Sequence, residues 1–146
     1  MENIKDLVNE LYTVNMKIKR IVKASKYEEY DDLSGLNYDS SDPDDAFLVT
    51  ELRQIMDKLD DASRNIDYIT RPVKGVYTLH KNRNGRYECS AREFTSGYGI
   101  EFYYYNDFYE RYEWAASSVE HNGKDYYIVG YPDVKLDGLK IRIREV

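Results

Sequence analysis

Residues 66–80 read IDYITRPVKGVYTLH, and the hydrophobic period changes within this stretch. Before Pro72, apolar residues recur three and four positions apart, as they do on one face of a helix. After Pro72 they alternate, as in a strand with one buried face. Because proline disfavours helical geometry at the residue before it, the helix should stop at Arg71. The sequence therefore predicts an α+β protein, with a helical region at residues 1–70 and a β domain at residues 73–146.

Working outward toward the N-terminus, two apolar stripes indicate two helices of similar length. The first stripe consists of two heptad series, Ile4, Leu11, Ile18 and Leu7, Val14, Ile21; the second runs from Leu48 to Ile69. Asp42 and Pro43 suit the N-cap and the first helical position of the second helix. We expect an antiparallel hairpin, with Leu11, Val14 and Ile18 facing Leu52, Ile55 and Leu59. The stripes are wider than a two-stranded seam, and a four-helix homodimer formed through the helices would cover them.

Toward the C-terminus, six segments have the alternation and the flanking turns of short strands. They are Val76–Lys81, Arg86–Phe94, Ile100–Tyr105, Tyr112–Glu120, Tyr126–Tyr131 and Leu139–Arg144. Asn84-Gly85 and Asn122-Gly123 are dipeptides that favour two-residue hairpin turns. The pattern predicts a small antiparallel β-sheet or partly open barrel of about six strands, rich in tyrosine.

Composition excludes several classes of protein. The 146 residues are 42% hydrophobic, which allows a core, and the net charge is −6. No apolar run approaches the ~18 residues of a membrane span, and the charged start does not resemble a signal peptide, so we expect a cytoplasmic protein. A single cysteine excludes a multi-thiolate zinc site. Phosphate-binding glycine loops and the H-E-x-x-H motif are absent, so we expect no enzyme activity, cofactor or metal.

The acidic residues between positions 28 and 45 are the first candidate binding site. This segment has no basic residue and contains Glu28, Glu29, Asp31, Asp32, Asp39, Asp42, Asp44 and Asp45, with Tyr30 and Tyr38 among them. One interpretation is a solvated loop whose carboxylates cap turns and a helix. The other is a docking surface for a basic protein, since aromatic rings beside carboxylates suit arginine-rich surfaces. The spacing does not fit an EF-hand calcium loop.

The β half offers two further candidates. In the run Tyr103–Tyr105, alternation sends Phe102 and Tyr104 to one face and Tyr103 and Tyr105 to the other. We expect one pair in the core and the other available to a partner, with Trp114 as a core anchor. The row Lys140, Arg142, Arg144 could track a phosphate backbone, or it could be the solvated face of an edge strand. Residues 71–146 have a net charge of only +1, which argues against a strong basic field.

Cys89 and His80 are the one candidate pair for nucleophilic catalysis. If Asn84-Gly85 forms a two-residue turn, His80 lies directly opposite Cys89 on the paired strand. No oxyanion donor or orienting group accompanies them in the sequence. A buried, inert cysteine is therefore the preferred interpretation.

Several short pieces of the β half resemble a family in their order along the chain. They are Gly85-Arg86-Tyr87-Glu88, Glu93-Phe94-Thr95-Ser96-Gly97, Ile100-Glu101, Trp114, Asp125-Tyr126-Tyr127-Ile128-Val129 and the run from Leu136 to Arg144. Together, residues 85–145 resemble a small uncharacterised β domain family of Firmicutes phages and mobile elements. The resemblance implies a compact β-fold and a mobile-element origin, and it implies no reaction.

Small acidic phage proteins without catalytic motifs often inhibit host defence machinery. Since a nuclease channel is built to hold a polyanion, correctly spaced carboxylates can occupy it. The expected function is therefore binding and inhibition of a basic host protein, such as a nuclease, by an anti-CRISPR or other anti-defence protein that partly mimics nucleic acid. The alternative is a nucleic-acid-binding accessory protein that uses the β domain.

Overall fold

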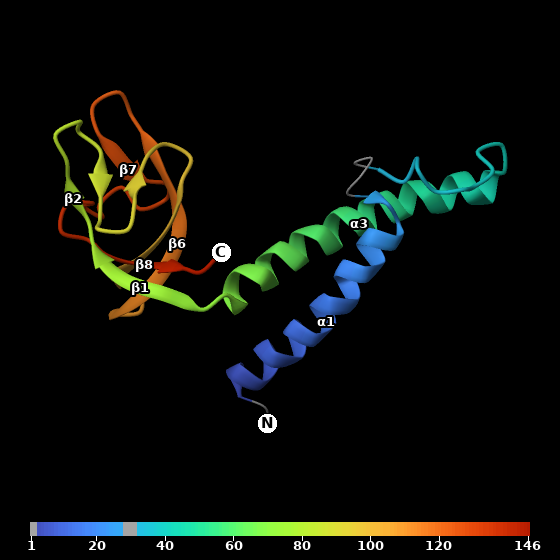
Figure 1. The fold of residues 1–146 in the computed structure, drawn as a ribbon, viewed down its shortest axis with the longest axis horizontal. Helices are drawn as coiled ribbons and strands as arrows, with labels where there is room; N and C mark the ends of the chain where they lie inside the picture. The colour runs from blue at the N-terminus through green and yellow to red at the C-terminus, as the bar shows by residue number, and fades with distance from the viewer. Residues whose placement is uncertain (1–2, 28–31) are drawn as a thin grey trace. The chain divides into compact units, whose positions relative to one another are not determined.

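The computed structural model describes residues 3–27 and 32–146 and divides the chain into two compact units, Met1–Arg71 and Pro72–Val146. The first unit is a helical hairpin and the second is a β domain (Figure 1). The protein is therefore α+β, as predicted. No helix among the described residues has both the length and the apolar character needed to cross a membrane.

The hairpin consists of α1 (Ile4–Ala24) and α3 (Pro43–Thr70). Asn3 caps α1, because its Oδ1 accepts a hydrogen bond from the backbone N–H of Asp6 at 2.9 Å. Asp42 caps α3 and Pro43 takes its first position, as predicted. The helix ends at Thr70, and Arg71 is extended ahead of Pro72, so the predicted stop is also confirmed.

Contacts between the two helices are antiparallel, but the contact face differs from the predicted one. The core of the hairpin contains Ile18, Val22, Leu33, Val49, Met56 and Ile66. Ile18 is buried as predicted, whereas Val14 and Ile55 remain 48% and 45% exposed. The reason is a polar contact: buried Asn15 donates from its Nδ2 to Oδ1 of Asp67 at 2.9 Å, which turns this side of α1 toward α3.

The β domain contains eight strands among its residues, where the sequence indicated about six. They are β1 (Val73–Thr78), β2 (His80–Lys81), β3 (Tyr87–Glu88), β4 (Glu93–Phe94), β5 (Gly99–Asn106), β6 (Arg111–His121), β7 (Tyr126–Ile128) and β8 (Lys140–Arg144). The first predicted strand is interrupted at Leu79 and contributes to two sheets as β1 and β2. The second is interrupted by a turn in which the Cys89 N–H donates to the Arg92 carbonyl.

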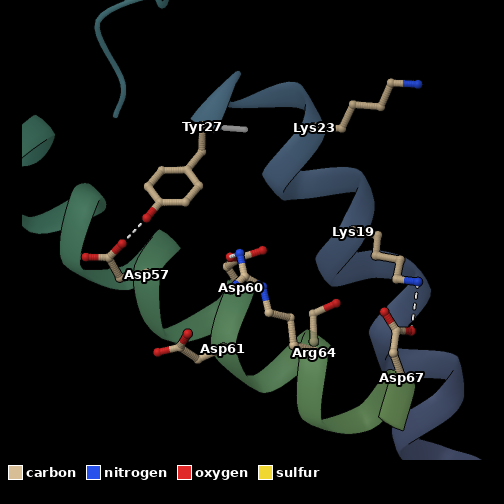
Figure 2. A pocket seen from close by; sticks show the side chains of 9 residues that line it. Lys19, Lys23, Tyr27, Asp57, Asp60, Asp61, Arg64 and Asp67 are labelled. Carbon is tan, nitrogen blue, oxygen red and sulfur yellow. Dashed lines mark hydrogen bonds and ion pairs between the residues drawn. The ribbon is translucent and has the colours of Figure 1, made fainter. Parts of the chain in front are cut away.

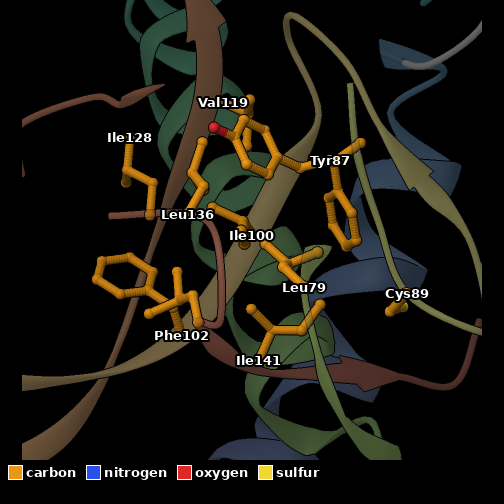
Figure 3. Packing of buried hydrophobic residues seen from close by; sticks show 11 residues of the cluster. Leu79, Tyr87, Cys89, Ile100, Phe102, Val119, Ile128, Leu136 and Ile141 are labelled. Atoms are coloured by element: carbon orange, nitrogen blue, oxygen red, sulfur yellow. The ribbon is translucent and has the colours of Figure 1, made fainter. Parts of the chain in front are cut away.

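Two antiparallel sheets form the domain, one with the order β1-β8-β5-β6-β7 and one with the order β2-β3-β4. The core draws side chains from both sheets and is shown in Figure 3. Leu79, Phe102 and Ile141 are fully buried in it, and Tyr87 and Phe94 contribute from the smaller sheet. Since Phe102 and Ile141 are cross-strand partners, the odd-numbered residues of β5 and the even-numbered residues of β8 project from the opposite face of the larger sheet.

Candidate binding surfaces

Four aromatic rings lie together on the face of the larger sheet that is turned away from the core. Tyr103 pairs with Trp114 across β5 and β6, and Tyr105 pairs with Tyr112. The rings of Tyr103 and Tyr112 stack, with centroids 5.3 Å apart and planes inclined by 12°. Trp114 packs against Tyr103 at 5.2 Å, and Tyr105 packs edge-on against Tyr112 at 5.2 Å. Tyr103 and Tyr105 thus form the outward pair and Phe102 the core, as alternation allows.

Two more aromatic residues occupy the turn that joins β5 to β6. Phe108 is 85% exposed and Tyr109 is 58% exposed. The turn is well ordered by hydrogen bonds, since Oδ1 of Asn106 accepts from the backbone N–H groups of both residues. Arg111 lies over the Tyr109 ring at 4.8 Å. We call the segment Tyr103–Trp114 the aromatic hairpin; its exposed rings are Tyr105, Phe108, Tyr109 and Tyr112.

A carboxylate on the far face holds this hairpin in shape. Oε1 of Glu113 accepts hydrogen bonds from Tyr104 Oη at 3.1 Å and from Asn106 Nδ2 at 2.7 Å. The hydrogen bond from Asn106 lowers the pKa of Glu113. Partial burial, together with the hydrogen bond to Glu113, raises the pKa of Tyr104 to about 12. The outward rings thus lie on a hairpin whose opposite face is held by the hydrogen bonds to Glu113.

The cationic row Lys140, Arg142, Arg144 shares the outward face with the aromatic rings. The Arg142 guanidinium lies over the Trp114 ring at 4.4 Å, and the Lys140 ammonium lies over Tyr103 at 4.9 Å. Trp114 is therefore half-buried beneath cations on the outer face, and its prediction as a core anchor is wrong. The alternation of side chains along the strands explains the error. Trp114 lies directly opposite Tyr103 on the neighbouring strand, so both side chains project from the outer face.

Glu101 neutralises part of this row. Its carboxylate is buried and accepts hydrogen bonds from Nε of Arg142 and from Nε and Nη2 of Arg144, the last two at 2.9 and 3.0 Å. Both arginines are thereby committed to a carboxylate on the same face. Sequence reasoning missed this group, because its members lie about forty residues apart and only the β5–β8 pairing brings them together.

The acidic segment is described only in part. Glu28, Glu29, Tyr30 and Asp31 lie outside the described residues. Asp32 accepts a hydrogen bond from the backbone N–H of Ser34, and Asp39 accepts from the N–H and the hydroxyl of Ser41. Hydrogen bonds from the side chain and then the backbone of Ser34 lower the pKa of Asp32, and those from Ser41 lower the pKa of Asp39 in the same way.

The remaining members of the segment also take part in local structure. Oδ2 of Asp45 accepts from the backbone N–H of Asp39, and Asp44 lies in the first turn of α3, where a negative charge suits the helix dipole. Tyr38 is half-buried against the core of the hairpin. The described carboxylates thus act as turn and helix caps.

A charged groove between α1 and α3 was not foreseen from the sequence (Figure 2). It is lined by Lys19, Lys23, Tyr27, Asp57, Asp60, Asp61, Ser63, Arg64 and Asp67. Lys19 pairs with Asp67 at 2.8 Å, and Arg64 pairs with Asp60 at 2.8 Å. Its charges therefore largely neutralise one another. In the described parts of the chain no three acidic, histidine or cysteine side chains converge as a metal site would require.

The predicted pairing of His80 with Cys89 is wrong. His80 is paired with Glu88, because the loop after β2 contains an extra residue and Gly85 adopts a φ of 76° within it. A shift of one residue sends paired side chains to opposite faces. Cys89 is buried, whereas the His80 ring is exposed and lies 3.5 Å from the Glu88 carboxylate.

Comparison with known protein families gives a match that lies inside the β domain. Residues 77–143 match the model of a family described as a domain of unknown function, DUF5348. The match covers less than half of the chain and leaves out the helical hairpin. It agrees with the expected resemblance to a small uncharacterised domain family. No curated protein and no solved structure matches this chain.

Proposed function

We propose that this protein acts by binding another protein, without catalysis, and that the aromatic hairpin makes the contact. The observation that carries the proposal is the set of exposed rings on a rigid hairpin, with Phe108 at its tip almost fully exposed. Clustered exposed aromatic side chains typically mark interaction sites, and tyrosine supplies contact area at low conformational cost. Because the hairpin is ordered before binding, little entropy is lost when a partner covers it.

The same geometry favours a protein over a nucleic acid as the partner. Single-stranded nucleic acid needs free ring faces for its bases and free cations for its phosphates. Here Tyr103 and Tyr112 cover one face of each other, Arg142 and Lys140 lie on the rings, and Glu101 holds Arg142. The sequence-based alternative, nucleic-acid binding through the row on β8, therefore has less support than protein binding.

Charge near the tip suggests what kind of protein would bind. Asp107 and Glu110 flank the two exposed rings of the turn, and the whole chain carries a net charge of −6. Carboxylates beside tyrosine and phenylalanine rings suit an arginine-rich surface, which can form ion pairs and stack at the same time. The partner in this proposal is thus a basic protein. The acidic segment before α3, which has eight acidic residues and no basic one, would add long-range attraction to such a partner.

The origin of the protein, its location and the identity of its target belong to the same proposal. A phage or mobile-element origin, action in the bacterial cytoplasm and a host defence nuclease as the target are supported by the acidic charge and by the resemblance of residues 85–145. The aromatic hairpin would then insert beside the basic nucleic-acid channel of such an enzyme. Inhibition would follow from occlusion of that channel.

Affinity capture from a bacterial lysate, followed by titration of each captured protein in purified form, tests the proposal. We expect the double variant Phe108→Ala, Tyr112→Ala to weaken binding at least tenfold, since exposed aromatic anchors dominate such interfaces. The matched control is Phe47→Ala, which removes a comparably exposed ring from α3. Equal binding by the double variant and the wild type would overturn the assignment to the hairpin. Tight binding of a labelled oligo-dT strand, lost in Lys140→Ala, would favour the nucleic-acid alternative instead.

A further inference from the structure

The two flanks of the helical hairpin differ in chemistry. The charged groove identifies one flank, because residues of both helices line it, among them Lys19 and Lys23 of α1 and Asp57 and Asp61 of α3. The opposite flank is apolar and exposed. Its members are Leu7, Val14 and Ile21 of α1, which are 51%, 48% and 46% exposed, and Leu48, Leu52 and Ile55 of α3, which are 52%, 37% and 45% exposed.

Helical geometry places these apolar residues on one continuous face. At about 100° per residue, Leu7, Val14 and Ile21 form a stripe beside the buried position of Ile18, on the side away from Lys19 and Lys23. On α3, the rotation of about 100° per residue places Leu52 and Ile55 beside buried Met56. This side of the helix lies away from Asp57 and Asp61. Since the groove residues define the opposite flank of both helices, the two stripes lie on the same side of the hairpin.

The side chains beside the apolar stripe of α1 change from acidic to basic at its centre, Val14. Asp6 and Glu10 precede Val14, and Lys17 and Arg20 follow it, all on the outer edge of the stripe. Neither Glu10 nor Lys17 makes an ion pair within residues 3–27 and 32–146. An antiparallel copy of α1 would bring opposite charges together at both ends. The pattern is self-complementary, which suits a second copy of α1 as the partner.

We propose that a second copy of this chain covers the apolar flank, with the two α1 helices antiparallel across a two-fold axis near Val14. In this arrangement Val14 meets the partner's Val14, and Leu7 meets the partner's Ile21. Glu10 then lies beside the partner's Lys17, twice by symmetry. The exposed Leu52 and Ile55 of α3 widen the face beyond a two-stranded seam, so the product is a four-helix assembly. This proposal concerns the helices and is independent of the aromatic hairpin.

Charge exchange on the full-length protein tests the pairing directly. We expect light scattering of the wild type at micromolar concentration to give twice the chain mass of 17.3 kDa. Each of Glu10→Lys and Lys17→Glu places like charges opposite one another at two sites, and should raise the dimer dissociation constant about tenfold. The double variant carrying both exchanges should return to the wild-type value. A wild type that is monomeric at all concentrations, or a double variant weaker than both single variants, would overturn the proposal.

Variants at the axis provide a second test. Val14→Glu brings two carboxylates together at the two-fold axis and should give a monomer, whereas Met16→Glu, on the far side of α1 and 64% exposed, should remain a dimer. Circular dichroism checks that both variants retain their helices. With Cys89 replaced by Ala, mild oxidation should link Val14→Cys, but not Met16→Cys, into covalent dimers. Linkage of both or of neither would place the contact elsewhere, on a different partner or on the β domain.

Discussion

Glu101 is the charged residue whose loss we expect to destabilise the β domain most. Its side chain is 8% exposed and binds two guanidinium groups at once, those of Arg142 and Arg144. The substitution Glu101→Gln keeps the shape of the side chain and removes its charge. Arg142 and Arg144 then each lose a charge-assisted hydrogen bond to the Glu101 carboxylate.

The expected cost follows from the burial of all three groups. Removing one partner from a buried ion pair costs about 3–5 kcal/mol, because the remaining charge is left uncompensated. The side chains of Arg142 and Arg144 keep 23% and 16% of their surface exposed, so water compensates in part. We therefore expect Glu101→Gln to lower the free energy of unfolding by about 2–3 kcal/mol. For a domain of this size that corresponds to a fall in Tm of about 10–20 °C.

Trp114 makes the measurement specific to the β domain, since it is the single tryptophan of the chain and lies on β6 under Arg142. Urea unfolding of the full chain, followed by tryptophan fluorescence, gives the free energy for the wild type and the variant. Glu120→Gln, on the same strand and without an ion pair among the described residues, is the matched control and should change stability by less than about 0.5 kcal/mol. A Glu101→Gln variant as stable as this control would refute the reasoning.

Three further predictions concern single groups. Cys89 is buried, so a thiol reagent at neutral pH should label it only as the β domain unfolds; rapid labelling of the native protein would contradict this. The pKa of Tyr104 is raised to about 12, so its contribution to stability is present below pH 10 and is lost as the pH rises through 12. Carbon NMR of the tyrosine ring should show a lower pKa for Tyr104 in Glu113→Gln. An unchanged pKa would mean that the hydrogen bond to Glu113 does not raise it. The hydrogen bond from Lys19 lowers the pKa of Asp67, so the stability that Asp67 adds is present above its ordinary pKa of 3.8 and is lost as the pH falls below that value. In Asp67→Asn, the acid unfolding of the helices followed by circular dichroism should start from a lower stability and depend less on pH, and an unchanged profile would exclude the pair.

The elements that sequence alone could predict are those set by local chemistry. Asp42 and Pro43 begin α3 and Pro72 ends it, because capping and the proline restraint act within a few residues. The face on which the helices meet was predicted less well. The apolar stripe is wider than the contact, and the choice within it depends on Asn15 reaching Asp67, which is fifty-two residues away.

The prediction of strand register from the sequence was limited in the same way. Asn84-Gly85 correctly indicates a turn, but one extra residue in the loop moves His80 opposite Glu88 and removes the candidate catalytic pair. The sequence does not state the length of a loop, and in a sheet a shift of one residue reverses every side chain. The split of the predicted strands at Leu79 likewise depends on packing, since Leu79 is fully buried where the chain passes from one sheet to the other.

In the aromatic hairpin, the face of β5 that is buried determines both the fold of the domain and the composition of the candidate site. Both faces of β5 carry aromatic rings, so its sequence allows either face to be buried. Pairing with β8 removes the ambiguity: the Phe102 partner is Ile141, and the Glu101 partner is Arg142. Burying the other face would place Glu101 and the basic side chains of β8 in the core, at a large desolvation cost. The register that buries Phe102 therefore also gathers Tyr103, the arginines and Glu101 on the outer face. A binding surface built in this way cannot shift without unfolding the sheet, which is why variants at the exposed rings, and not at Glu101, are the ones that separate binding from stability.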